Sequence, residues 1–465
     1  MSDPAYPNEI NDTNVRRVFA DAADLNVRQL QCRGHMLYMY AIDGLTASNT
    51  ISEYIVKPIM QNLSGSTPQQ LYEEALGGGV VNFVARECKD LDDVTRLLVN
   101  GFCIVLFEHA GAIAFETKTG EKRSLSGPEL EHTAKGPKDS FVETIRTNTS
   151  LIRRHLRTPE LKLYETVVGE KSLTNVSVVW IDGIAEPKLV ECMKARIESI
   201  QTDNMLTPAA VEELITGSRK TAFPLLQYTE RTDRFCTGLL RGRVGVLVDG
   251  LPLGYLAPVD LGYLMYSPED LTRDYLSATW VRILRYGALI LGLLLPALYI
   301  GLVMHHLQWL PENLETVLQA NRVPFSPAWE VLCLLLAFEL LQESGIHLPQ
   351  SIGQSVSIIG GIIVGSAGVE AGLISSMALI TVSIAGVCGF VLPNRDLAAA
   401  IRLWRFVLAA AASVAGIWGV GIGVMILGIH LSTIKSLGRP YLSLKQPGLL
   451  RKRLKTQSKN DREWN

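Results

Sequence analysis

A chain of 465 residues is long enough to form two or three domains. Its 44 Lys+Arg and 46 Asp+Glu leave a formal net charge of −2, which excludes the basic excess of a nucleic-acid-binding protein, so no nucleic-acid partner is predicted. The 7 cysteines show no Cys-x-x-Cys spacing, which excludes a zinc ribbon and gives no sign of a disulfide framework.

Residues 1–24 are predicted to be a polar N-terminal extension. The stretch Met1–Asn14 lacks the apolar core of a signal peptide, so we expect the part that follows to remain on the side of synthesis, in the cytoplasm. Charged residues keep the density of a water-soluble protein up to residue 285, whereas the long uncharged stretches lie after Tyr286. The first part is therefore predicted to be soluble and the second to lie in lipid.

The soluble part contains a repeated pattern, in which an apolar run ends in Asp-Gly and leads into a helical periodicity. The runs and their helices are residues 36–45 with 47–61, and residues 176–184 with 188–200. Each copy continues with a predicted hairpin, 102–107 with 112–115 and 244–251 with 254–257. We therefore predict two related α/β subdomains, 25–135 and 165–275, each with a small mixed sheet.

Residues 136–164 between the subdomains are predicted to form a connecting, arginine-rich helix over 141–156. Its basic side chains Arg146, Arg153 and Arg154 are candidate coupling residues.

Asp43 and Asp182 each follow a predicted strand, where the sites of α/β proteins form. The competing interpretation is that they are turn residues that bond to their own backbone. No phosphate loop, nucleophile elbow or zinc-protease motif accompanies them. The adjacent pair His305-His306 follows an apolar run and is more typical of a solvated interface than of a metal site. The chain is therefore predicted not to be an enzyme, with no catalytic residue, cofactor or metal.

Residues 280–436 are predicted to form an all-α membrane domain of four to six spans. The first, 286–304, carries no charged side chain and contains Pro296, a kink that membrane helices tolerate. Arg282 and Arg285 precede it, so the positive-inside rule places its N-terminal end in the cytoplasm.

Further spans are predicted near 328–343, 350–369, 371–392 and 406–434, followed by a basic tail at 437–465. Five simple crossings would place that tail outside, against the positive-inside rule. A re-entrant segment, a last stretch that folds back, or a failure of the rule would each remove the conflict.

Four carboxylates lie within or beside these spans, and such groups are costly in lipid and so indicate an ion path or a partner. They are Glu330, Glu339, Glu343 and Glu370. Glu339 and Glu343 share one helix face, as in the acidic ring of an oligomeric cation pore. Alternatively the carboxylates lie in interfacial water or pair with Arg322 or Arg405.

Small and polar side chains recur at helical spacing along 351–369, and this stripe is a candidate pore or gate lining. The residues are Gln354, Ser357, Gly361, Gly365 and Gly368. The Gly-x-x-x-Gly spacing at 361–365 equally favours close packing against another helix.

Several stretches in both parts of the chain resemble the A subunits of spore germinant receptors, the GerA-type family. The matching stretches of the membrane part are 293–299, 338–349, 351–356, 369–372 and 393–395. Those of the soluble part are 146–154, 180–184, 229–234 and 242–249. The similarity runs from about residue 25 to Tyr441. Ser344 stands where the family usually has Ala, and Arg395 where it commonly has Tyr.

The resemblance implies an α+β cytoplasmic region of two related α/β subdomains followed by an all-α polytopic membrane domain. It implies a multi-pass protein of the spore inner membrane, with its N-terminal domain on the cytoplasmic side, the spore core. It also implies a permease-like B subunit and a lipoprotein C subunit as partners. Self-association into a ring would form a nutrient-gated cation channel that triggers germination.

Four other functions are weighed against this one. A transporter would need about ten helices with inverted repeats, and a membrane-anchored enzyme would need a catalytic motif before residue 285. A non-conducting scaffold and an accessory A-type paralogue that amplifies germination are both compatible with the sequence.

Overall fold

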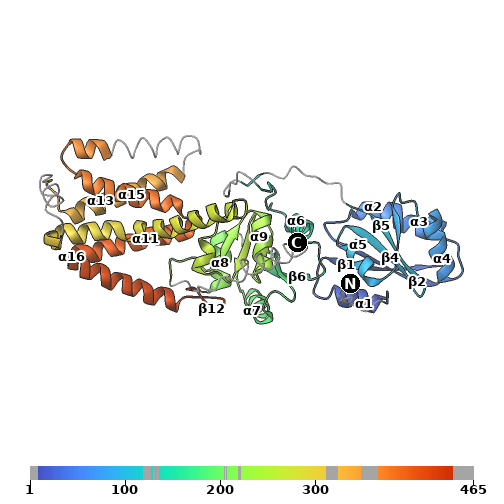
Figure 1. Cartoon of the computed structure of the whole chain (residues 1–465). Coiled ribbons are helices and arrows are strands. Elements are labelled where there is room, and N and C mark those ends of the chain that lie inside the picture. The colour runs from blue at the N-terminus through green and yellow to red at the C-terminus, as the bar shows by residue number, and fades with distance from the viewer. Residues whose placement is uncertain are drawn as a thin grey trace, which may run out of the picture. The chain divides into compact units, whose positions relative to one another are not determined.

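The computed structural model describes residues 9–118, 127–128, 131, 136–203, 205, 207–217, 221–309, 323–346 and 365–442. The chain divides into two compact units. The N-terminal unit comprises residues 1–218 with 226–258, and the C-terminal unit comprises 219–225 with 259–465. Each unit is described by itself (Figure 1).

The N-terminal unit begins with a sheet in the order β1-β2-β4-β5-β3. Its strands are β1 Leu25–Cys32, β2 His35–Ile42, β3 Ala85–Cys88, β4 Phe102–Phe107 and β5 Gly111–Glu116. The helices around it are α1 Asp12–Val18, α2 Ser48–Ile51, η1 Ser52–Val56, α3 Lys57–Asn62, α4 Pro68–Glu74, η2 Ala75–Gly79 and α5 Leu91–Leu98. One face packs on Val15 and Leu91, from α1 and α5, and the other on Ile59 and Leu71, from α3 and α4. Because both faces are covered, the central strand β4 is apolar and buried throughout.

A second sheet repeats the same order as β6-β7-β9-β10-β8. Its strands are β6 Leu161–Val168, β7 Thr174–Ile181, β8 Gln227–Thr229, β9 Val244–Val248 and β10 Gly254–Ala257. Its helices are α6 Ile145–His155, α7 Pro187–Glu198, α8 Pro208–Thr216 and α9 Thr232–Leu240. The two Asp-Gly turns bond alike, since the amide of Asp43 donates to the carbonyl of Asp24 and that of Asp182 to Glu160, both at 2.8 Å.

The predicted fold class, two related subdomains followed by a helical domain, is confirmed, and the predicted hairpins are β4-β5 and β9-β10. The prediction of mixed sheets is wrong, because every strand pair of the two described sheets is antiparallel. The sequence analysis also missed strands β1, β3, β6 and β8. The turn Arg33-Gly34, with φ of 49° and 87°, folds β1 back onto β2 as a two-residue hairpin.

The C-terminal unit is mainly helical. Its helices are α10 Leu261–Leu264, η3 Pro268–Leu271, α11 Tyr275–His305, η4 Leu307–Trp309, α13 Pro327–Ile346, α15 Ser376–Val391 and α16 Arg395–Thr433, followed by strands β11 Lys435–Ser436 and β12 Arg439–Pro440. Two of the described helices, α11 and α16, are long and apolar enough to cross a membrane, and α15 is a shorter apolar helix.

Helix α16 folds back on itself at Ala415 and Gly416, where the backbone leaves helical geometry (φ/ψ −126°/16° and 58°/−141°). After this break, the position of a Cβ on Gly423 would lie 2.4 Å from the Leu408 side chain, so the two halves of α16 pack side by side. The sequence analysis left three explanations open for the side on which the basic tail lies. One of them, a last stretch that folds back, is present in the structure.

The start of α11 and the end of α16 lie at the same end of the C-terminal unit. The amide of Val259 donates to Ser436 Oγ at 2.9 Å, and the amide of Leu261 donates to the carbonyl of Tyr441 at 3.0 Å. At the other end, His305 approaches Ser413 and Gly416. Helix α11 and the second half of α16 therefore run antiparallel.

Candidate functional site

Helix α6 joins the two sheets through a buried ion pair. Both Nε and Nη2 of Arg153 donate to the carboxylate of Asp24, at 2.7 and 2.8 Å. The Arg153 side chain is 0% exposed and that of Asp24 is 3% exposed. Nη1 of the same guanidinium donates to the carbonyl of Thr158. This two-point contact holds the second subdomain in one orientation on the first.

Three further contacts surround this pair. Arg146 forms an ion pair with Asp43 at 2.5 Å, and Ser150 Oγ donates to the carbonyl of Gly44 at 2.9 Å. On strand β6, which follows α6 in the chain, Lys162 Nζ donates to the carbonyl of Val18 at 2.7 Å. Burial lowers the pKa of this amine. Asp43 thus has a structural role at the junction, which favours the turn interpretation over the catalytic one.

The three arginines proposed for coupling differ in their surroundings. Arg146 and Arg153 lie seven positions apart on the face of α6 that contacts the first subdomain. Arg154 is exposed, and its carbonyl accepts a hydrogen bond from Arg157. The structure therefore brings two of the three together at the junction.

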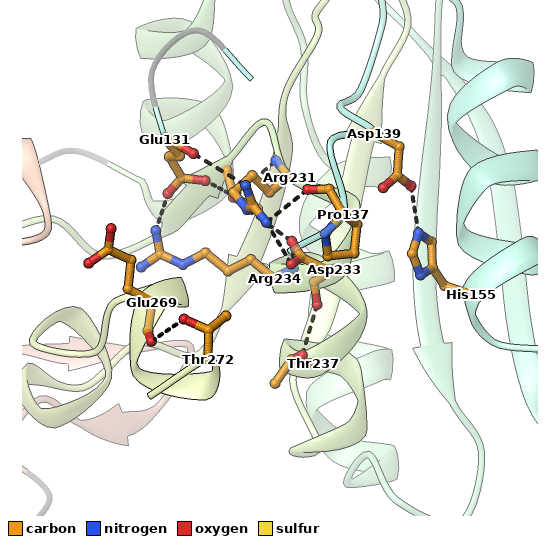
Figure 2. A network of polar contacts seen from close by, with 11 residues as sticks. Glu131, Pro137, Asp139, His155, Arg231, Asp233, Arg234, Thr237, Glu269 and Thr272 are labelled. Atoms are coloured by element: carbon orange, nitrogen blue, oxygen red, sulfur yellow. Dashed lines mark hydrogen bonds and ion pairs between the residues drawn. The ribbon is translucent and has the colours of Figure 1, made fainter. Parts of the chain in front are cut away.

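A second network anchors the segment that precedes α6, and Figure 2 shows it from close by. The buried guanidinium of Arg231 donates to both carboxylate oxygens of Asp233, at 3.0 and 2.7 Å. It also donates to the backbone carbonyls of Glu131 and Pro137, at 3.4 and 3.2 Å. Glu131 and Pro137 lie in the chain between β5 and α6, a stretch called here the connecting segment, and Arg231 therefore ties this segment to the start of α9.

The carboxylate of Glu131 adds two further hydrogen bonds to this network. One of its carboxylate oxygens accepts a hydrogen bond from Arg234 and the other accepts one from Thr229 (Figure 2). The amide of Phe141 donates to the carbonyl of Glu230 at 2.7 Å. Sequence reasoning noted residues 229–234 for their resemblance alone, because their partners lie about a hundred positions away in the chain.

His155 and Asp139 form an adjoining ion pair, with Nε2 to Oδ2 at 2.5 Å (Figure 2). The hydrogen bond to Asp139 raises the pKa of His155 above its ordinary 6.5, and the same bond lowers the pKa of Asp139 below 3.8. The charged pair therefore ties the end of α6 to the connecting segment in mildly acidic solution.

The stability of this contact should depend on pH. Asp139 contributes above its unfolded pKa near 3.8, and His155 contributes below its unfolded pKa near 6.5, a contribution that disappears as pH rises through the raised folded pKa. Amide exchange at the end of α6, measured between pH 5 and pH 9 and corrected for intrinsic rates, should therefore become faster above neutrality. His155→Gln should remove this dependence, whereas His109→Gln on the β4-β5 turn should retain it. An unchanged profile in His155→Gln would show that another group titrates there.

The acidic candidates of the membrane part lie in different settings. Glu339 on α13 pairs with Arg402 on α16 at 3.1 Å. The sequence analysis offered Arg322 or Arg405 as partners for the carboxylates. Arg405 is not the ion-pair partner of Glu339, since it donates to the carbonyl of Ala385 at 2.9 Å. Glu343 and Glu370 are exposed. A carboxylate of a predicted span therefore pairs with an arginine at Glu339, and the partner is Arg402.

The small-residue stripe lies largely outside the described residues, as do Gln354, Ser357 and Gly361, and also Arg322. At Gly365 a Cβ would lie 3.2 Å from the side chain of Leu379, so this glycine packs closely against α15. Glu330, one of the four carboxylates for which the sequence analysis weighed an ion path against a partner, is buried and accepts a hydrogen bond from the amide of Ser375 at 2.9 Å. Among the described residues, no group of three His, Cys, Asp or Glu side chains could hold a metal ion.

Comparison with known proteins places these features in a family. The family model described as "Bacillus/Clostridium GerA spore germination protein" matches residues 13–459. The "Uncharacterized membrane protein YfkQ" of Bacillus subtilis is 34% identical over 95% of this chain and 86% of its own length. "Spore germination protein KA" is 32% identical over 93% and 80%, and "Spore germination protein A1" is 33% identical over 90% and 86%, both from the same organism.

One solved structure is also similar, the N-terminal domain of the A subunit of the Bacillus megaterium spore germinant receptor GerK3. The TM-score is 0.42 at 22% identity, and the match covers 55% of this chain and 98% of that one.

Proposed function

The chain belongs to the GerA family of spore germination proteins, and from this premise we propose that it is the A subunit of a nutrient-sensing spore germinant receptor. The observation that carries the proposal is the extent of the family match, which includes both the two-sheet unit and the helical unit. Relatives named as spore germination proteins KA and A1 support it over at least 90% of the chain. The proposed role is non-enzymatic.

In this proposal the C-terminal unit spans the spore inner membrane several times and forms a nutrient-gated cation channel in a ring of copies. The apolar helices α11 and α16 support a membrane location. The Glu339–Arg402 pair and the buried Arg405 support a polar interior between helices, since charged groups in membrane proteins face the bundle or water. A permease-like B subunit and a lipoprotein C subunit are the proposed partners.

The fold of α16 bears on the proposed topology. Because α11 and the second half of α16 run antiparallel, residues 259–275 and 435–442 lie on one side if both helices cross the membrane. We assign that side to the cytoplasm, the spore core, since Arg282 and Arg285 precede the apolar part of α11. The basic tail then begins on the cytoplasmic side, as the positive-inside rule requires.

The junction around α6 has a mechanical role in this proposal. A sensor domain can bias a two-state gate only if a displacement of one subdomain also moves the other, which requires a rigid connection between them. The Arg153–Asp24 pair and the Arg231 network fix α6 to the first subdomain and the connecting segment to the second. We therefore propose that the N-terminal unit moves as one body during gating.

Deletion of the gene tests the receptor role. Purified spores that lack the chain should lose early potassium release for particular nutrients, and should keep the release that a non-nutrient trigger causes. Unchanged release for every nutrient would leave an accessory paralogue as the better description.

Conductance of the purified complex in planar bilayers separates a channel from a scaffold. A channel passes a nutrient-dependent cation current, and Glu339→Gln should alter its selectivity, because the substitution removes the negative charge that balances Arg402 near the proposed path. Leu336→Gln, at an exposed position on the same helix, provides a matched uncharged control. A complex that assembles and passes no current would be a scaffold.

A further inference from the structure

The chain passes between its two units at 218/219, 225/226 and 258/259. The last two of these connections lie among the described residues. Because a peptide group is planar, its carbonyl and its amide move together, so a hydrogen bond to either one restrains both residues that the group joins. The contacts of the peptide groups 225–226 and 258–259 therefore decide how firmly a movement passes along these two connections.

The hydroxyl of Ser436 binds both of these peptide groups. Its Oγ donates to the carbonyl of Leu225 at 2.7 Å and accepts a hydrogen bond from the amide of Val259 at 2.9 Å. A serine hydroxyl has one hydrogen to donate and two lone pairs that accept, so a single side chain can make both contacts. Ser436 and Val259 are each 1% exposed, so water has little access to these bonds. All three residues belong to the C-terminal unit.

The peptide group 258–259 is also held through its carbonyl. Nε of Arg243, a residue of the N-terminal unit that lies just before β9, donates to the carbonyl of Pro258 at 3.1 Å. The Arg243 side chain is buried, as is Ser436 on the amide of the same group. Rotation of this peptide group would therefore break both hydrogen bonds.

Both connections lead to one pair of strands. Gln227 at the start of β8 is the register partner of Leu256 in β10, and β10 ends at Ala257. Strand β8 is the edge strand of the second sheet, and its Thr229 donates to Glu131 in the network of the connecting segment. Ser436 therefore lies at the end of a continuous series of contacts that begins at the connecting segment.

Ser436 follows directly on α16. It pairs with Arg439 in the β11–β12 hairpin, whose turn Leu437-Gly438 has φ of 45° and 80°. The amide of Tyr441 donates to the carbonyl of Ile434, the residue that caps the end of α16, at 3.1 Å. The hairpin that carries Ser436 is therefore fixed to the end of this helix.

The segment that leads to Leu225 packs on α16 as well. Thr221 Oγ1 lies 3.0 Å from Nε2 of His430, and the ring centroid of Phe223 lies 6.2 Å from that of the same histidine. The His430 ring in turn lies 5.8 Å, between centroids, from Trp404 in the first half of the helix. Residues 221–225 are therefore in contact with α16 before the chain continues into β8.

We propose that Ser436 is a coupling residue, the point at which a displacement of the strand pair β8–β10 is passed to the end of α16. A movement of either strand displaces a peptide group that is bonded to Ser436, so α16 must follow or the hydrogen bond must break. The inference deepens the proposed function, and it rests on that proposal only in taking the gate as the output of the movement.

Hydrogen exchange of the full chain in detergent tests this coupling without recording a current. Thr229→Val removes the hydroxyl that binds Glu131 and so disturbs β8. In the chain that keeps Ser436, this change should speed exchange in peptides covering 434–442 by about threefold or more, as expected between coupled residues. In the Ser436→Ala background the same change should speed exchange there by less than about 1.5-fold, because the connection is lost.

Ser432→Ala is the matched control, because Ser432 is exposed and its hydroxyl donates to the carbonyl of Ile429 in its own helix. In this background Thr229→Val should act as it does in the otherwise unaltered chain, and exchange in β4 and β5 should be the same in all variants. An equal effect of Thr229→Val in the Ser436→Ala and Ser432→Ala backgrounds, or no effect at 434–442 in any of them, would overturn the proposal. Faster exchange in β4 and β5 as well would assign the effect to general unfolding, with the same consequence.

Single-channel recording of the purified complex adds a readout that separates coupling from conduction. With a mixture of amino acids and sugars as the stimulus, Ser436→Ala should lower the open fraction about fivefold to tenfold, as expected for the loss of a buried hydrogen-bonding hydroxyl. The unit current should stay the same, and Ser432→Ala should change neither quantity. An altered unit current, or an open fraction equal to that of Ser432→Ala, would contradict the proposal.

Failure of this inference differs from failure of the receptor function. An unaltered complex that passes no current would remove the proposed channel, and the exchange measurements would then decide by themselves whether Ser436 couples the strand pair to α16. A conducting complex in which Ser436→Ala behaves as Ser432→Ala would retain the channel and remove the coupling role.

Discussion

Replacing Arg153 with alanine is expected to lower the free energy of unfolding of the N-terminal unit by about 3–5 kcal/mol, because removing one partner leaves a buried charge uncompensated. Asp24 would remain at 3% exposure without the two hydrogen bonds that now satisfy its carboxylate. Hydrogen exchange of the full chain in detergent, followed in peptides that cover β1 and β6, measures this change. Exchange should become faster in both strands, because the pair joins the two subdomains.

Two controls separate the buried pair from a general effect of charge. Arg154→Ala removes the adjacent, exposed arginine and should change stability by no more than about 0.5 kcal/mol. Replacing Arg153 and Asp24 together with apolar residues of similar size should recover much of the loss, since no unpaired charge remains. If Arg153→Ala exchanges as slowly as Arg154→Ala, the pair is not what holds the junction.

The sequence predicted the repeat because each copy carries its signal locally. An apolar run, an Asp-Gly turn and a helical periodicity occupy neighbouring positions, and the structure places a strand, a turn with positive φ at Gly44 and Gly183, and a helix there. Strand β1 escaped because most of its side chains are exposed or half-buried, so its composition is that of a polar segment. Only the turn Arg33-Gly34 indicated that it pairs with β2.

The candidate site was only partly predictable, for a physical reason. Sequence reasoning identified an arginine-rich helix, but Arg153 binds an aspartate 129 positions away and Arg231 binds carbonyls about a hundred positions away. No local pattern records such partners. Helical spacing does place Arg146 and Arg153 on one face of α6, and that spacing would have separated them from Arg154.

The sequence could offer the fold-back of α16 only as one of three explanations for the side of the basic tail, because the contacts at the break also come from distant parts of the chain. Glycine is common in membrane helices and does not by itself end one. At the break, His305 and His306 lie against residue 416, a contact between distant positions that the local sequence does not record. The sequence analysis interpreted these histidines as a solvated pair. In the structure they pack against the turn at Gly416, and the ring of His306 stacks on that of Trp309 with 4.5 Å between the ring centroids.

Gly416→Val is therefore expected to open the fold-back of α16. At φ 58° and ψ −141° a β-branched residue is strained by about 1–3 kcal/mol, and its Cβ would lie 2.8 Å from that of His305. Since about 1.4 kcal/mol is a tenfold change in an equilibrium, the folded-back form should lose roughly one to two orders of magnitude in population relative to a straight helix. The end of the chain would then lie on the opposite side of the membrane.

A cysteine introduced at Leu442 reports this change through a membrane-impermeant maleimide in sealed, right-side-out vesicles. It should be protected in the otherwise unaltered chain, because residues 435–442 lie at the cytoplasmic end in the proposed topology. It should become labelled when Gly416→Val is added. Gly421→Val is the matched control, since a Cβ at Gly421 meets nothing within 4 Å. Protection in both variants would mean that the contacts of Trp404 and Leu408 with the second half of α16 hold the hairpin closed without the glycine.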